Sequence, residues 1–240
     1  MSIDEKIIRA KKDYENVYDA GKKAEYDKFW DACQNYGNRT NYTYGVCGYT
    51  FNADNFYPKY DIRPSNASRM FYSWRDTGGI PHQIGFNLAE RLKECNVVLD
   101  TSQPCILELT FAYSDFGELP AIDMTNATNL TGTFNACNVL KKIEKIISGE
   151  NTPFVSSSTF KSCGALQDVV FEGVIGQNGL NLQWSTRLTH DSLMSVINCL
   201  QDKTSDTSGT TWIVTLGTTN MAKLTVDELA IAKNKGWTVQ

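Results

Sequence analysis

The chain has 240 residues, a formal net charge of −4 and 41% hydrophobic residues, a composition typical of a folded protein. No cluster of Lys and Arg provides the positive surface that nucleic acid requires, so we expect no nucleic-acid partner. No apolar run reaches the roughly 18 residues of a membrane span, and Met1–Lys6 lacks the basic and apolar parts of a secretory signal. We therefore expect no membrane insertion, and we expect the protein to fold in a cytoplasm.

The first segment, residues 1–35, is predicted to be a long helix. Ser2 and Glu5 form a capping box, and small or apolar residues then recur at steps of four and three. These candidate oligomer-interface residues are Ile3, Ile7, Ala10, Tyr14, Val17, Gly21 and Ala24. The seam favours a homo-oligomer, with a trimer preferred. The alternative is a helix that folds back to cover the first repeat, since open repeat arrays need covered ends.

Aromatic residues crowd the second segment, residues 36–64. Alternation around Tyr42, Tyr44 and Tyr49 predicts short strands, and these tyrosines are candidate ligand contacts because Tyr beside small polar residues is common at binding surfaces. The competing interpretation, which we favour, is an N-terminal cap that buries its rings against the first repeat.

An internal repeat organises the third segment, residues 65–198. Phe, Cys, Leu and an aliphatic residue recur at steps of three in two adjacent copies, with a looser copy before them. The predicted repeat-core residues are Phe111, Phe134, Cys137, Leu140, Ile143, Phe160, Cys163, Leu166 and Val169. A repeat of this length predicts a solenoid, in which each unit buries its apolar face against its neighbours. The seven cysteines form no C-x-x-C pair, so we expect buried free thiols rather than a disulfide framework.

The last segment, residues 199–240, is predicted to be a C-terminal cap. Thr189 and Ser192 offer caps for a helix running to about Leu200, and the residues from Thr211 to Leu216 alternate as a strand. Thr225 and Glu228 form a second capping box that opens a helix ending at Gly236. Helix, strand and helix would close the array.

The step-of-three pattern resembles the BspA-like class of leucine-rich repeats. Over nearly its whole length the chain is also similar to a group of bacteriophage and prophage virion proteins. These have an N-terminal helix ending near a Gly-Asn-Arg-Thr sequence (here 37–40), a short repeat array and a C-terminal helix ending in Lys-Gly-Trp-Thr-Val (here 235–239). The resemblance implies an α/β fold: a short leucine-rich-repeat solenoid of stacked parallel strands, with an N-terminal long helix and a C-terminal helix–strand–helix cap.

Catalytic and metal-binding patterns are weak in this sequence. His190, Asp191 and Ser192 have the residue types of a triad, but neighbours in sequence cannot converge as one. The acidic residues Glu108, Asp115, Glu118 and Asp123 could supply the carboxylate pair of a glycosidase, although turns and solvated faces explain them more simply. We predict no enzyme, no cofactor and no metal.

The resemblance implies a tail- or fibre-associated virion protein that adheres to host cells. Its expected partners are further copies of itself, other virion proteins bound through the N-terminal helix, and a host surface glycan or protein. The main alternative is a purely structural or decoration component without a receptor. A bacterial surface adhesin of the same repeat class is disfavoured by the missing secretion signal.

Overall fold

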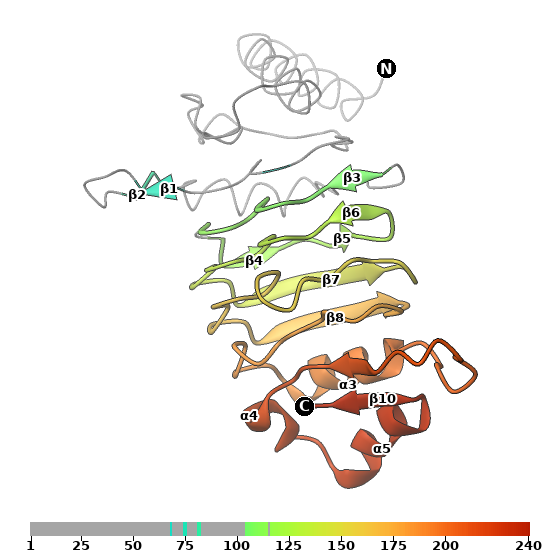
Figure 1. Cartoon of the computed structure of the whole chain (residues 1–240). Coiled ribbons are helices and arrows are strands. Elements are labelled where there is room, and N and C mark those ends of the chain that lie inside the picture. The colour runs from blue at the N-terminus through green and yellow to red at the C-terminus, as the bar shows by residue number, and fades with distance from the viewer. Residues whose placement is uncertain (1–67, 69–73, 76–80, 83–103, 115) are drawn as a thin grey trace, which may run out of the picture.

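A computed structural model describes residues 68, 74–75, 81–82, 104–114 and 116–240 of the chain (Figure 1). The predicted N-terminal helix, its oligomer-interface residues and the candidate tyrosines Tyr42, Tyr44 and Tyr49 lie outside these ranges. The described part is a mixed α/β structure in which short, mostly parallel strands outnumber a few helices.

Strands of successive repeats lie one below another along the described chain (Figure 1). A short antiparallel pair, β1 (Trp74–Arg75) and β2 (Pro81–His82), precedes them. The parallel pair β3 (Cys105–Ile106) and β6 (Ala127–Asn129) follows. The main sheet contains β4 (Glu118–Leu119), β5 (Ile122–Asp123), β7 (Lys142–Ser148) and β8 (Asp168–Gly173), with β7 paired in parallel to the other three.

The nine repeat-core positions named from the sequence are all buried, with side chains 3% exposed or less. The phenylalanines of successive repeats stack on one another: the ring centroids of Phe111 and Phe134 are 5.6 Å apart, and those of Phe134 and Phe160 are 5.0 Å apart. Offset aromatic pairs contribute about 1 kcal/mol each beyond the burial of their area. The row of rings therefore holds adjacent repeats in register. We call residues 104–188 the repeat stack.

The cysteines that lie three residues after Phe134 and Phe160 make contacts between layers. The Cys137 Sγ donates to the carbonyl oxygen of Phe111 at 3.0 Å, and the Cys163 Sγ donates to that of Phe134 at the same distance. Both cysteines are buried thiols. Each of these carbonyl oxygens also accepts a backbone amide, from Ser114 and Cys137 respectively, so each thiol adds a second donor from the next repeat while filling an apolar site.

Buried threonines make a second row of contacts between layers. Thr133 Oγ1 donates to the carbonyl oxygen of Leu107 at 2.9 Å, and Thr159 Oγ1 donates to that of Leu130 at 2.9 Å. Each Thr immediately precedes a stacked Phe in the sequence. The Thr–Phe pair therefore ties neighbouring layers through one polar and one aromatic contact.

Three residues other than glycine adopt left-handed backbone, each just before the repeat position held by Ser114, Cys137 or Cys163. Tyr113, Ala136 and Ser162 have φ of 60°, 57° and 60°. Each such residue costs roughly 1–2 kcal/mol. The turn points the amide of Tyr113 at the carbonyl oxygen of Asn135, 2.8 Å away, so the cost is offset by a hydrogen bond between layers.

The C-terminal end follows the predicted helix, strand and helix and adds two elements. The predicted elements are α3 (His190–Cys199), β9 (Trp212–Val214) and α5 (Val226–Asn234). The two additional elements, which the sequence did not predict, are the short helix α4 (Thr218–Met221) and the strand β10 (Trp237–Val239). β10 pairs in parallel with β9. Both expected caps are present: the Thr189 side chain accepts from the amide of Ser192, and Thr225 and Glu228 form the reciprocal capping box.

A buried asparagine closes the last layer of the stack. Leu182 and Ser185 occupy the positions of Phe and Cys in that layer, at the same step of three. From α4, the Asn220 Nδ2 donates to the carbonyl oxygens of Leu182, Ser185 and Leu216 at 3.2, 3.2 and 3.0 Å. Asn220 is 0% exposed. Its amide thus contacts the Leu182 carbonyl, the counterpart of the Phe111 and Phe134 carbonyls that the thiols contact.

No helix in the described ranges is both long and apolar enough to cross a membrane.

Candidate functional site

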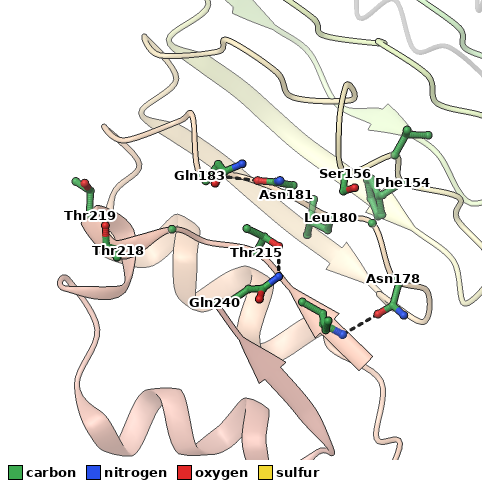
Figure 2. A pocket seen from close by; sticks show the side chains of 14 residues that line it. Phe154, Ser156, Asn178, Leu180, Asn181, Gln183, Thr215, Thr218, Thr219 and Gln240 are labelled. Carbon is green, nitrogen blue, oxygen red and sulfur yellow. Dashed lines mark hydrogen bonds between the residues drawn. The ribbon is translucent and has the colours of Figure 1, made fainter. Parts of the chain in front are cut away.

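An open groove of about 910 Å³ lies beside the last layers of the stack (Figure 2). Four stretches of chain that are distant in sequence contribute its lining. The lining residues are Phe154, Val155, Ser156, Asn178, Gly179, Leu180, Asn181, Gln183, Ile213, Thr215, Gly217, Thr218, Thr219 and Gln240.

One wall of the groove is a ladder of paired backbone. Asn181 pairs in parallel with Thr215, whose amide donates to the carbonyl oxygen of Leu180 at 3.1 Å. Next to it, the amide of Gln240 donates to the carbonyl oxygen of Val214 at 3.1 Å. Because these hydrogen bonds fix the backbone, the side chains that project from the wall have defined positions before any ligand arrives.

Two glycines let the segments approach closely enough to form the groove. Gly179 has φ of 110°, and a Cβ there would lie 2.0 Å from the carbonyl oxygen of Phe154. Gly217 has φ of 81°, and its Cβ would lie 2.9 Å from the Cβ of Gln183. Any side chain at these positions would strain the backbone and push the layers apart.

The side chains that line the groove are a mixture of polar and apolar ones. None of the residues that line it is Asp, Glu, Lys, Arg or His, and most carry an amide or a hydroxyl group. A surface of this kind can donate and accept hydrogen bonds but offers no side chain that titrates near neutral pH.

Some of these polar groups support the groove and others are available to a ligand. Asn178 uses both ends of its amide, donating to the Thr211 carbonyl at 3.0 Å and accepting from the Ile213 amide at 2.7 Å. The Asn181 Oδ1 accepts from the backbone amide of Gln183 at 3.0 Å, as Figure 2 shows.

The available groups lie along the rim. Within the described part of the chain, the side chains of Gln183, Thr218 and Thr219 form no hydrogen bond, and all three residues are exposed. Gln240 is also exposed, and its Nε2 makes one long contact of 3.4 Å to the Thr215 hydroxyl. These four side chains could exchange water for ligand at little cost to the fold.

The His-Asp-Ser sequence at 190–192 begins α3 and does not assemble a triad. The His190 Nε2 lies 2.8 Å from Glu228 Oε1, while the Ser192 hydroxyl accepts from the backbone amide of Val169 at 3.0 Å. The hydrogen bond to Glu228, with a further one to Asp191, raises the pKa of His190 above its ordinary value. The imidazole therefore joins α3 to α5, and the serine joins α3 to β8.

The acidic residues considered for glycoside hydrolysis occupy local contacts. The Asp123 Oδ1 accepts from the amide of Thr125 at 2.8 Å, and the Glu108 Oε2 accepts from Asn129 Nδ2 at 3.5 Å. Glu118 lies in β4, and Asp115 is outside the described residues. In the described ranges no group of three or more His, Cys, Asp or Glu side chains could hold a metal ion.

Comparison with known proteins returns no relative for this chain. No protein-family model matches it, and neither the curated proteins nor the solved structures contain a significant match. The groove is therefore interpreted from its own residues. The sequence did not reveal it because its lining comes from four separate stretches of chain and carries no motif.

Proposed function

We propose that this chain is a non-enzymatic virion protein of a bacteriophage or prophage, associated with the tail or fibre, that adheres to the host cell. In this proposal residues 65–198 form a short leucine-rich-repeat solenoid and residues 199–240 cap it. The resemblance described above suggests the virion role. The stacked phenylalanines and the thiol row support the repeat interpretation, since contacts between neighbouring layers are what stabilise such arrays.

The observation that carries the binding role is the groove, whose lining side chains are uncharged. Hydrolysis or group transfer needs a positioned acid, base or nucleophile, whereas the groove lining consists of amides, threonine and serine hydroxyls and apolar groups. A preformed hollow with exposed hydrogen-bonding groups on a fixed backbone favours reversible recognition.

Adhesion through such a surface would gain from several copies. We propose that the heptad residues of segment 1–35 assemble the chain, preferably as a trimer, and attach it to other virion proteins. Linking weak sites in this way can increase the overall affinity by about 10²–10⁴-fold without any new contact. Tyr42, Tyr44 and Tyr49 remain secondary candidates for receptor contact.

The direct test is saturable binding of the fluorescently labelled, full-length protein to a panel of intact bacterial cells. Saturable binding to some strains supports adhesion. Failure to bind any strain supports the alternative of a structural or decoration component. Light scattering on the full chain and on a chain beginning at Asn38 tests the assembly step: a trimer that becomes a monomer on truncation supports it, and a full-length monomer contradicts it.

A further inference from the structure

The main sheet has an exposed side, which we call the outer sheet face. It consists of the side chains of β4, β5, β7 and β8 that are not buried: Glu118, Asp123, Lys142, Glu144, Lys145, Ile147, Asp168, Val170 and Glu172. The helix α3 lies beside β8 rather than over this face (Figure 1), since its Ser192 and Ser195 hydroxyls accept from the backbone amides of Val169 and Phe171, both at 3.0 Å. The face is therefore open to a partner.

Carboxylates dominate the outer sheet face. It carries five acidic side chains and two lysines, whereas the whole chain has 27 acidic and 23 basic residues. One of the two lysines is already paired, because the Lys145 Nζ lies 2.7 Å from Glu172 Oε1. The Asp168 Oδ1 accepts from a neutral group, the Thr189 hydroxyl, at 3.2 Å. The face therefore repels anionic partners and attracts cationic ones.

Aliphatic side chains lie among these carboxylates. Val170 is 46% exposed and stands between Asp168 and Glu172 on the outer side of β8, because alternate residues of a strand share a face. Val174, directly after the strand, is 36% exposed, and the half-buried Ile147 pairs with Glu172 in register. Apolar surface rimmed by charged groups marks protein contact sites, whereas a small hydrated cation would make no use of it.

We infer that the outer sheet face docks a basic segment of a partner protein, in which an aliphatic side chain lies between two Lys or Arg residues. Asp168, Val170 and Glu172 follow one another at steps of about 6.6 Å along the strand. An extended partner segment matches them with basic, aliphatic and basic side chains at alternate positions. None of the outer-face residues lines the groove, so this inference goes beyond the proposed adhesive function and does not depend on it.

The first test maps where a basic probe binds. The probe is a synthetic peptide that repeats the sequence Lys-Ser-Val-Ser-Lys, titrated into full-length protein whose valine methyl groups are isotope-labelled for NMR. We expect methyl shifts at Val170 and Val174 and none at Val226, which is 82% exposed but lies on α5. Shifts of equal size at Val226, or no binding of the probe at low ionic strength, would overturn the inference.

The second test removes charge from the face and, as a control, from elsewhere. The face variant combines Asp168→Asn with Glu172→Gln. The control variant combines Asp202→Asn with Asp227→Asn, two exposed acids outside the face, so both variants lose two negative charges. At low ionic strength the face variant should bind the probe at least about fivefold more weakly than wild type, and the control should match wild type. An equal loss in both variants would mean that net charge alone attracts the probe, and the inference would be wrong.

A third comparison separates protein docking from the binding of counterions. A peptide with Gly in place of Val should bind more weakly than the probe, and Val170→Thr should weaken binding of the probe while Val226→Thr leaves it unchanged. If the Gly peptide binds as tightly as the probe, the face attracts cations only and docks no protein segment. These results leave the adhesive function untouched, because binding to intact cells is measured separately.

Discussion

The asparagine that closes the repeat stack gives the sharpest stability prediction. Asn220→Ala removes an amide that donates to three buried carbonyl oxygens, those of Leu182, Ser185 and Leu216. The Leu182 and Ser185 carbonyls each keep one backbone donor, from Ser185 and Leu188 respectively. The substitution therefore removes the second donor of two carbonyls and the side-chain donor of the third.

The size of the effect follows from these contacts. A typical hydrogen bond contributes about 1 kcal/mol net, and a buried group left without its partner costs about 1–3 kcal/mol. The Nδ2 group has two hydrogens for these three acceptors, so we expect Asn220→Ala to lower the free energy of unfolding by about 2 kcal/mol. The Lys223 Nζ, which donates to the Asn220 Oδ1 at 3.1 Å, keeps the carbonyls of Thr186 and Leu188 as acceptors and adds little.

Urea unfolding followed by circular dichroism measures this change. Asn234→Ala is the matched control because that asparagine is exposed at the end of α5, and it should change the free energy of unfolding by less than about 0.5 kcal/mol. Asn220→Asp keeps the volume but replaces the donors with acceptors, so it should also destabilise the protein. A loss below about 1 kcal/mol in both Asn220 variants would refute the closing role of this side chain.

Three further predictions concern single side chains. Within the described structure the buried Ser185 hydroxyl has no hydrogen-bond partner, so Ser185→Ala should raise the free energy of unfolding by about 1 kcal/mol in the same urea assay, and a decrease would contradict this account. The hydrogen bond to Glu228 raises the pKa of His190, so this pair stabilises the fold fully below the ordinary histidine pKa of 6.5 and less as the pH rises through the raised value. His190→Ala should flatten that pH dependence of the urea midpoint, and an unchanged profile would exclude the pair as its source. Burial raises the pKa of the Cys163 thiol, so iodoacetamide should modify the half-buried Cys199 before Cys163 in the native protein. Peptide mass mapping would detect this order, and equal rates of modification would argue against a closed core around Cys163.

The sequence predicted the repeat positions because burial and spacing coincide there. Phe134 and Cys137 fall on one turn, three residues apart, and the same turn recurs at Phe160 and Cys163, so the pattern can be read without a structure. The capping box at Thr225 could also be read, because its hydrogen bonds join residues three apart. Features that depend on residues three apart can therefore be predicted from a single sequence.

Features set by contacts between layers could not be predicted in the same way. Asn220 reaches the Leu182 carbonyl across 38 residues, and an asparagine in a short helix has no pattern that would reveal this contact. The left-handed backbone of Tyr113 and Ala136 also could not be predicted from the sequence, since neither residue type favours a positive φ. The groove was equally unpredictable, because its polar side chains come from separate stretches of chain and belong to no motif.

The thiol row has a consequence for how this protein can vary. The Cys137 thiol reaches back 26 residues and the Cys163 thiol 29, yet both meet their carbonyl at 3.0 Å. The additional residues must therefore lie outside the stacked positions, in the outer turns, and one such turn between Ser148 and Thr159 carries the groove residues Val155 and Ser156. Insertions and deletions in these turns can reshape the groove while the aromatic row stays intact. One core could in this way serve a family of variants with different specificities.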